Sequence, residues 1–277
     1  MAVGGEGTHE QAGPAAPDQA RQSWGGASFG TIVRVVSVAA TLAAWEWYGR
    51  GIDPIFLSYP TAIMAAVPKM LASGELQAAF LNSAQGLVTG TVLAIVGGVL
   101  LGLLMGRYRT MDYLLDVQIS ALYSTPHVAL IPLLVLWFGF GSMAKFVLIF
   151  LSAFFPIVIN THSGVRNIGQ GLVEVALAEG ASERQIFTKI VLPAASPFIM
   201  TGIRLAMGRA VVAMVVADMF TAVSGLGGAL LSYGAAFATD KLFVVIILLA
   251  LMGVGLTELV RGLERVLMPW KETERAQ

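Results

Sequence analysis

Two sets of residues in this sequence have types and spacings suited to chemistry. The first is a charged segment, 174–193 (EVALAEGASERQIFTKIVLP), and the second is a few isolated polar residues within long apolar runs. In the charged segment, five charges surround alanine and glycine residues, which let another chain come close. The chemistry predicted for this segment is therefore docking in a defined orientation. The alternative is a helical hairpin on the membrane surface whose charges are only solvated.

The isolated polar residues could line a path for a solute, because ionisable groups at membrane depth are costly and so are candidates for function. Arg209 and Asp218 lie nine residues apart, about two and a half helical turns, so we expect them to face nearly opposite sides and not to pair. Pairing with another helix or subunit is the alternative to a substrate role, and an anionic substrate would favour Arg209. The other path candidates are Tyr123, Thr125, His127 and Asn160. The structural alternative is hydrogen-bonded packing for His127 and hydrogen bonding between helices for Asn160.

The residue types do not support enzymatic chemistry. The sequence has no cysteine, and its three histidines (His9, His127 and His162) are too scattered to suggest a metal cluster. It contains neither a nucleophile–base arrangement nor a GxxxxGK[ST] phosphate-binding loop. We therefore expect no catalytic residue, no metal and no cofactor on this chain.

The elements that must position these residues are membrane-spanning helices. Of the 277 residues, 56% are hydrophobic and 12% are charged, whereas a soluble domain carries about 25% charged residues. The stretches 76–106, 117–144 and 146–165 contain no Asp, Glu, Lys or Arg, and about 20 apolar residues suffice for a spanning helix. The composition predicts an all-α integral membrane protein.

We predict six transmembrane helices, near 31–49, 79–106, 118–138, 144–163, 196–219 and 242–260, and an amphipathic, non-spanning piece at 61–71. The second span carries glycines suited to close helix contact: Gly86, Gly90, Gly97, Gly98, Gly102 and Gly106. Residues 224–228 are expected to form an outside loop, either a docking surface for a partner or a flexible turn. Residues 1–30 and 271–277 are predicted to be cytosolic tails, the first of them disordered, on either side of a membrane domain at 31–270.

Lysine and arginine residues predict the orientation, because they concentrate on the cytosolic side. With the amino terminus inside, the internal set has twelve residues: Arg21, Arg34, Arg107, Arg109, Arg166, Arg184, Lys189, Arg204, Arg261, Arg265, Lys271 and Arg275. The external set has four: Arg50, Lys69, Lys145 and Lys241. Both termini and the 164–195 loop are therefore expected in the cytosol.

Within that loop the pattern predicts two short helices, 172–179 and 182–190. Gly180 can adopt the left-handed conformation that ends the first helix. Ser182 and Gln185 match the capping box that begins the second. Pro193 is expected to close the second helix, because the residue before a proline disfavours helical geometry.

Segment 174–193 also resembles the EAA loop of ABC importer permeases, whose pattern is E-A-A, three residues, G, nine residues, I-x-L-P. The matching residues are Glu174, Ala176, Gly180, Ile190, Leu192 and Pro193, while Val175 replaces the first alanine. The stretches 126–141 (PHVALIPLLVLWFGFG), 153–168 (AFFPIVINTHSGVRNI) and 202–219 (GIRLAMGRAVVAMVVADM) look like permeases of the nitrate, sulfonate, taurine and bicarbonate importer group. The resemblance covers about 55–270.

The resemblance implies a type I ABC importer permease architecture in a bacterial inner membrane, with 164–195 as a cytosolic coupling-helix loop. It also implies ABC ATPase subunits that carry ATP and Mg²⁺, a second permease subunit and an extracytoplasmic solute-binding protein. The homodimer is the expected form, with a heterodimer as its alternative. A sulfonate, a nitrate-like ion or a related organic anion is the expected solute.

Two rival functions remain at this point. An ion-coupled secondary transporter would be expected to show internal repeats and acidic residues in mid-membrane. Only Asp218, near the end of a span, meets the second condition. A membrane enzyme or scaffold is the other rival, and it lacks a supporting arrangement of residues.

Overall fold

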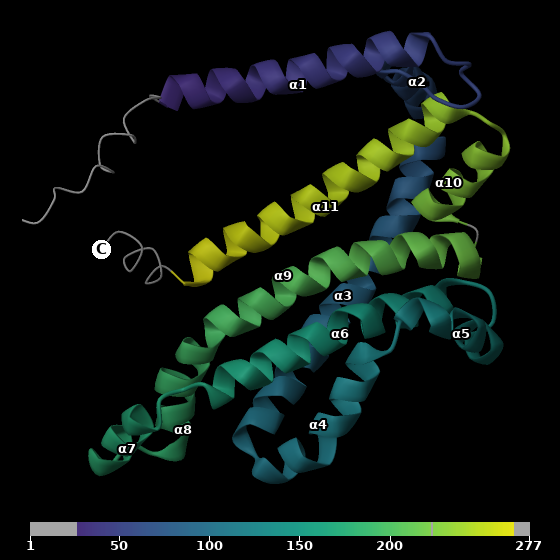
Figure 1. Ribbon diagram of the computed structural model, residues 1–277. Coiled ribbons are helices and arrows are strands. Elements are labelled where there is room, and N and C mark those ends of the chain that lie inside the picture. Colours follow the sequence, from purple (N-terminus) through teal and green to yellow (C-terminus); the bar gives the residue numbers. More distant parts are fainter. Residues whose placement is uncertain (1–26, 223, 269–277) are drawn as a thin grey trace, which may run out of the picture.

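The structure is a computed structural model, and it describes residues 27–222 and 224–268. Within those residues it consists of helices joined by turns, without strands (Figure 1). The elements are α1 (Ala27–Arg50), α2 (Pro60–Ser73), α3 (Glu75–Arg107), α4 (Arg109–Ser124), η1 (His127–Leu130), α5 (Ile131–Phe138), α6 (Ser142–Arg166), α7 (Gln170–Ala178), α8 (Glu183–Ile186), η2 (Phe187–Val191), α9 (Leu192–Ala217), η3 (Asp218–Ala222), α10 (Gly225–Ala235) and α11 (Thr239–Leu267). The predicted tails lie outside the described residues, except that 27–30 begin α1.

Five helices in the described chain are long and apolar enough to cross a membrane: α1, α3, α6, the continuous helix Glu183–Thr221 and α11. A sixth span exists if α4 and the η1–α5 segment are taken together, and these two parts meet at a bend of 90°. The prediction of a single helix over 118–138 is therefore wrong, because this stretch consists of two helical parts that meet at the bend. Thr125 is extended (φ −73°, ψ 131°) because it precedes Pro126, and a residue before proline disfavours the helical region.

The centre of the molecule is formed by α3, α6 and α9, which share the largest hydrophobic cluster (Figure 1). Small residues recur at every fourth position of α3: Gly86, Gly90, Ala94, Gly98, Gly102 and Gly106. The five glycines of this series face α6 residues with the same spacing: Lys145, Ile149, Ile157, Thr161 and Val165. A methyl group at Gly102 would lie 2.6 Å from Thr161 Cβ, so the glycines permit the close approach of the two helices. The close-contact prediction is confirmed for these five, whereas Gly97 meets the Phe154 ring at ordinary distance.

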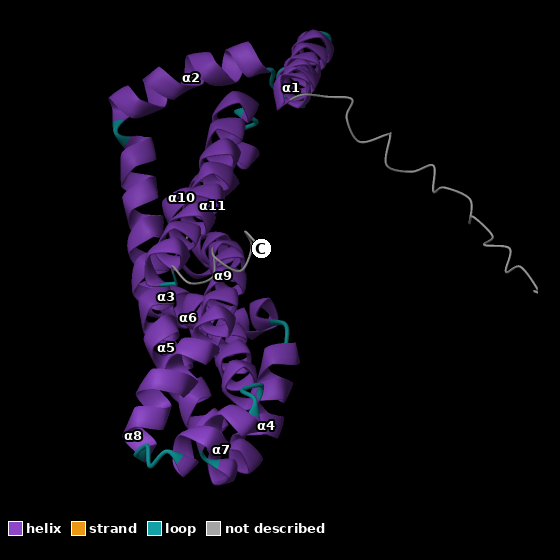
Figure 2. Ribbon diagram, turned by 90° about the vertical axis from the view of Figure 1, so that its left-hand side faces the viewer, coloured by secondary structure: helices purple, strands orange, loops and turns teal. Residues whose placement is uncertain are grey.

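Helix α1 stands away from this bundle and is attached through its carboxyl-terminal end (Figure 2). Trp45 donates a hydrogen bond to the carbonyl of Ser58 (3.0 Å), and its ring packs against Phe243. Glu46 accepts hydrogen bonds from the backbone N–H (3.0 Å) and the hydroxyl (2.7 Å) of Thr61. The Glu46 carboxylate thus satisfies a free N–H at the start of α2. The amphipathic piece predicted at 61–71 is this helix.

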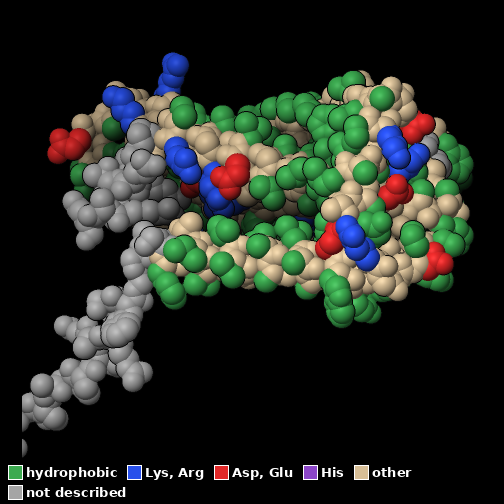
Figure 3. Space-filling view, turned by 90° about the horizontal axis from the view of Figure 1, so that it is seen from above, with side chains coloured by type: hydrophobic (Ala, Val, Ile, Leu, Met, Phe, Trp, Pro, Cys, Tyr) green, Lys and Arg blue, Asp and Glu red, His purple; other side chains and the backbone are tan. Residues whose placement is uncertain are grey.

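The described helices run between two ends of the molecule. One end, called the loop end below, carries α7, α8 and the turn between α3 and α4 (Figure 1). The opposite end, called the far end, carries α5, α10 and the connection between α1 and α2. Hydrophobic side chains are spread over the face seen in Figure 3, while the charged ones lie mainly toward its two ends. This distribution suits a protein that spans a bilayer.

Candidate functional site

The predicted end of the first short helix in the loop is confirmed. Gly180 has φ +78°, and its N–H donates to the carbonyl of Leu177 (3.0 Å). The N–H of Ala181 donates to the carbonyl of Ala176 (2.9 Å). These two bonds form a Schellman motif, in which the left-handed residue reverses the chain and satisfies the last carbonyls of α7.

The predicted capping box is also present, but the second helix does not end where expected. Ser182 Oγ accepts from the N–H of Gln185, whose side chain accepts from the N–H of Ser182. The helix then runs on through the π-helical turn η2 into α9, so the prediction that Pro193 closes it is wrong. A proline within a helix lacks an N–H and its ring crowds the carbonyl four residues earlier. A wider π-helical turn just before Pro193 relieves that crowding.

Helix α7 exposes apolar side chains that nothing in the described chain covers. Leu172, Val175 and Leu177 are 59%, 64% and 55% exposed. Of the six motif residues, three are exposed (Glu174, Gly180 and Leu192) and three are partly buried (Ala176, Ile190 and Pro193). An exposed apolar face of this kind is typical of surfaces that bind a partner. Val175, which stands where the EAA pattern has its first alanine, lies on this surface, and α7 is intact around it.

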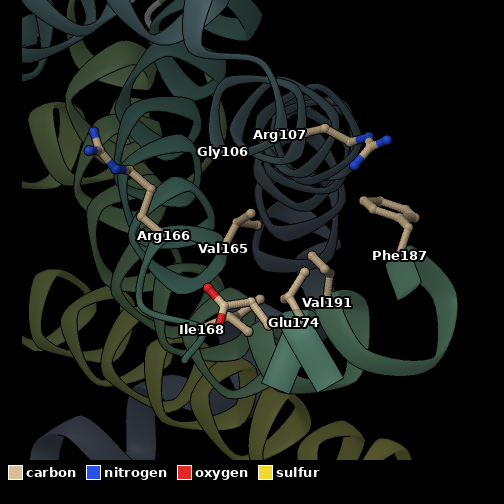
Figure 4. Close-up of a pocket in the computed structure, with 9 residues that line it drawn as sticks. Gly106, Arg107, Val165, Arg166, Ile168, Glu174, Phe187 and Val191 are labelled. Carbon is tan, nitrogen blue, oxygen red and sulfur yellow. The ribbon is translucent and has the colours of Figure 1, made fainter. Parts of the chain in front are cut away.

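The loop is held against the ends of α3 and α6. Arg107 Nη2 lies 2.6 Å from Glu183 Oε2 and joins α3 to α8. Between the loop and the helix ends is an open pocket of about 380 Å³ (Figure 4), lined by Gly106, Arg107, Val165, Arg166, Ile168, Val173, Glu174, Phe187 and Val191. Figure 4 shows the Arg107 and Arg166 side chains directed to opposite sides, away from Glu174. Glu174 thus lies where the loop meets the ends of α3 and α6.

An ion-pair cluster beside the loop was not predicted. Asp112 Oδ2 lies 2.7 Å from Arg166 Nη1, and Asp112 Oδ1 lies 2.9 Å from His162 Nε2. Asp116 lies close to Asp112 and His162, and these three side chains have the types and spacing of a metal-ligand group. Asp112 shares its two oxygens between Arg166 and His162, so the cluster ties α4 to α6 directly before the loop. Its signal in the sequence is weak, since 54 residues separate Asp112 from Arg166.

The structure brings three of the predicted path residues together at membrane depth. Arg209 Nη2 donates to Tyr123 Oη (2.8 Å), and the guanidinium lies 4.5 Å from the centre of the Tyr123 ring. His127, whose ring stacks on Phe155, lines a pocket of about 270 Å³ together with Arg209. The complete lining is His127, Val128, Ser152, Gly208, Arg209, Val212 and Ala213. Five of these seven residues were not predicted, and Ser152 and Gly208 are among them.

The other two predicted path residues bond within their own helices. Thr125 Oγ1 donates to the carbonyl of Ala121 (3.0 Å). Asn160 Nδ2 donates to the carbonyl of Pro156 (2.8 Å), and its Cβ lies against Gly202 at the contact of α6 with α9. The structure does not place either residue in the Arg209 pocket, and these hydrogen bonds lie within one helix and not between helices as the structural alternative expects.

The prediction that Asp218 does not pair with Arg209 is confirmed. Asp218 instead lies in a buried network at the far end. Its Oδ1 lies 2.5 Å from Lys145 Nζ, and its Oδ2 accepts from Ser83 Oγ (2.5 Å). For Asp218 the structure therefore favours the structural role. No partner was predicted for Lys145, although two opposite charges isolated in apolar runs are a signal for such a pair.

The prediction of a loop at 224–228 is wrong, because Ser224 precedes α10 directly, Gly225 begins that helix, and the segment closes over Asp218. Leu226, Gly227 and Gly228 are buried. The N–H of Leu226 donates to Ser83 Oγ (2.8 Å), and that of Gly227 to Asp218 Oδ2 (3.4 Å). The glycines serve contact within the chain: a side chain on Gly225 would meet Asp218 and Ser83.

Comparison with known proteins gives one family and a matching fold. The family model described as "Binding-protein-dependent transport system inner membrane component" matches residues 94–270. An aliphatic sulfonates transport permease protein, SsuC of Bacillus subtilis (strain 168), is 34% identical over 91% of this chain and 92% of its own length. The taurine transport system permease protein TauC of Escherichia coli (strain K12) is 31% identical over 88% and 89%. A chain of the inward-facing MetNI methionine ABC transporter superposes with a TM-score of 0.51 at 22% identity, over 69% of this chain and 97% of that one.

Proposed function

This chain belongs to the family of binding-protein-dependent transport system inner membrane components, and on that premise we propose which solute it carries and how it is driven. The chain is a permease subunit of an ABC importer, and its fold is that of a type I importer permease. An ion-coupled secondary transporter receives no support, since this family works with a binding protein. The solute is a small organic anion of the sulfonate class, because the relatives SsuC and TauC are named for aliphatic sulfonates and taurine.

The observation that carries the proposed mechanism is the exposed surface of α7 and Gly180 at the loop end. An ABC ATPase subunit docks there, and ATP and Mg²⁺ bind to that subunit and not to this chain. The apolar side chains Leu172, Val175 and Leu177 supply buried area, while Glu174 and the other charges fix the orientation. This chain performs no covalent chemistry.

The loop end faces the cytosol, and both termini lie on that side. Support comes from the lysine and arginine residues, of which twelve fall in the predicted internal set and four in the external set. The loop end carries Arg107, Arg109 and Arg166 in the described chain. The far end then faces the extracytoplasmic binding protein that delivers the solute.

A second permease subunit, most simply a second copy of this chain, covers the side of the molecule that carries Arg209. Arg209 and Val212 are exposed there although they lie within the apolar helix α9. Tyr123, His127 and Arg209 line the translocation path between the two copies. When the ATPases close, they push on the loop, and α6 and α9, which flank it, transmit the movement to this path.

The proposed coupling is tested with the complete complex of permease, ATPase and binding protein. Glu174→Lys and Gly180→Val together are expected to abolish ATP hydrolysis stimulated by the solute-loaded binding protein, while the permease still folds in the membrane. Gly262→Ala on α11, where an added methyl group meets open space, is the matched control and should leave stimulation unchanged. Full stimulation in the double variant would contradict the assignment of the loop.

A further inference from the structure

We infer that the pocket lined by His127, Ser152 and Arg209 holds the anionic group of the solute while the solute crosses the membrane. The inference rests on the proposed function, and it adds where within the chain the charge of the solute is met. The ligand class is a small monovalent oxyanion, such as an alkanesulfonate. Tyr123, which holds the guanidinium, is a positioning residue for this site.

The first observation is an unbalanced charge. Several other ionisable groups of the described helices form ion pairs: Glu46–Arg50, Arg107–Glu183, Asp112–Arg166, Lys145–Asp218, Arg204–Glu264 and Arg261–Glu258. Arg209 lies within α9, eight residues before its end at Ala217, and its described polar partner is the neutral Tyr123 hydroxyl. A guanidinium ion at membrane depth without a counter-ion is costly. An anion that enters the pocket removes that cost.

The second observation is the chemistry of the lining, which offers donors and no carboxylate. Tyr123 Oη accepts from Arg209, so its own O–H remains free to donate. His127 Nε2 is buried without a hydrogen-bond partner in the described chain, and Ser152 adds a buried hydroxyl group. A guanidinium fork with nearby hydroxyl groups matches the geometry of an oxyanion.

The third observation is the backbone around the pocket. The 90° break at Pro126 places Tyr123 on α4 and His127 on η1, on the two sides of the bend. Broken helices commonly form solute sites in transporters because they bring polar groups to membrane depth. Gly208 lies next to Arg209 in the lining, and a side chain there would meet open space. Gly208 therefore leaves room for the organic part of the solute.

A carboxylate from a second copy of the chain is the competing source of negative charge. Asp218, Glu258 and Glu264, which lie within the spans, are already paired. Asp116 is exposed on α4, about two turns before Tyr123, and so is the candidate that a second copy could offer. The observations favour the solute, because the pocket has a volume of about 270 Å³ and its polar side chains come from three different elements, η1, α6 and α9.

The experiment uses the complete complex in proteoliposomes, with uptake of radiolabelled ethanesulfonate and ATP hydrolysis measured together. Arg209→Gln should lower ethanesulfonate uptake by about tenfold or more, as expected for the loss of a charge-assisted hydrogen bond. Arg209→Lys should retain part of the uptake, since it keeps the charge. Arg34→Gln, which removes an exposed charge on α1, is the control and should transport normally.

Two further variants separate the possible sources of the anion and the effect of size. If Asp116 of a second copy neutralises Arg209, Asp116→Asn will reduce uptake as strongly as Arg209→Gln, and the inference is overturned. Gly208→Val should admit methanesulfonate but exclude longer alkanesulfonates; equal uptake of both would also overturn it.

A binding measurement keeps the inference testable if the natural solute is not a sulfonate. In the complex without binding protein, sodium ethanesulfonate should raise the melting temperature relative to sodium gluconate at equal ionic strength. Arg209→Gln should abolish that rise, and Arg34→Gln should preserve it. A wild-type complex that takes up no sulfonate contradicts the proposed solute. A rise in melting temperature that survives Arg209→Gln contradicts the site.

Discussion

Lys145 Nζ lies 2.5 Å from Asp218 Oδ1, and the two side chains are 3% and 0% exposed. The same ammonium group donates to the carbonyl and to Oδ1 of Asn82 at 3.0 Å each, while Asp218 also accepts from Ser83. One ion pair therefore joins α6, the end of α9, α3 and the start of α10 at the far end. The loop joins α6 to α9 at the opposite end, so these two helices are connected at both ends and should move as one unit.

Removing one member of this pair should destabilise the protein far more than removing both. Lys145→Met or Asp218→Asn leaves a buried charge without its partner, which costs about 3–5 kcal/mol. The double variant removes both charges and should recover most of that loss. Unfolding of the purified permease in SDS–detergent mixtures measures the double-mutant cycle. Arg261→Gln, from a half-exposed pair with Glu258, is the control and should cost about 1 kcal/mol or less. Additive single effects would contradict this account of the network.

Two neighbouring glycines of α3 should respond differently to the same substitution. Gly98→Ala would place a methyl group 2.9 Å from Ile157 Cγ2 and 3.1 Å from the carbonyl of Phe154, so α3 and α6 would have to separate, at a cost of about 1–3 kcal/mol. Gly97→Ala meets the edge of the Phe154 ring at 3.4 Å. It should be neutral or stabilising by up to about 1 kcal/mol, because alanine favours the helix. Equal melting temperatures for the two variants would refute the close packing of α3 against α6.

The glycines at the start of α10 should matter for folding and not for contact with the binding protein. Gly225 has φ +64°, and a side chain there would collide with Asp218 and Ser83. Gly225→Ala should therefore lower the yield of folded permease, whereas Gly234→Ala, where open space surrounds the site, should not. A Gly225→Ala protein of normal stability that fails to respond to the loaded binding protein would restore the docking interpretation of 224–228.

Gly180 should be required for two separable reasons, its backbone angle and its lack of a side chain. Asparagine tolerates the left-handed region and β-branched valine does not, while open space surrounds Gly180 within the chain. Gly180→Asn should thus preserve the end of α7 but hinder a closely fitting ATPase, and Gly180→Val should disturb both. Hydrogen exchange of 170–182 reports the helix, and ATPase affinity reports the docking. Normal ATPase affinity in Gly180→Asn would show that close approach is not needed there.

How far the sequence predicts this molecule depends on whether the signal is local. The end of α7 at Gly180 and the Ser182–Gln185 box depend on residues a few positions apart, and both were predicted from spacing. The glycine series of α3 is also local, and five of its six predicted contacts were confirmed. The apolar composition of the spans likewise set their number and approximate places.

Features that depend on contacts between distant residues were missed or misplaced. The partner of Asp218 lies on another helix, and the Asp112–His162–Arg166 cluster joins two helices in the same way. The bend at Pro126 could have been predicted, because a proline that follows a residue with an extended preference often breaks a span. Glycines 225, 227 and 228 were assigned to a loop because their composition resembles one, whereas the buried Asp218 carboxylate explains their presence.

The most direct test of the central claim is a crosslink between the loop and an ATPase subunit. The chain has no cysteine, so Val175→Cys and Glu179→Cys each introduce one exposed thiol on α7 or directly after it. Leu231→Cys on α10 at the far end is the matched control. With a short bifunctional maleimide, the account predicts that both loop variants crosslink to the ATPase subunit in the assembled complex and that the control does not. A complex that is active in transport but gives no loop crosslink, or that crosslinks equally through Leu231→Cys, would contradict it.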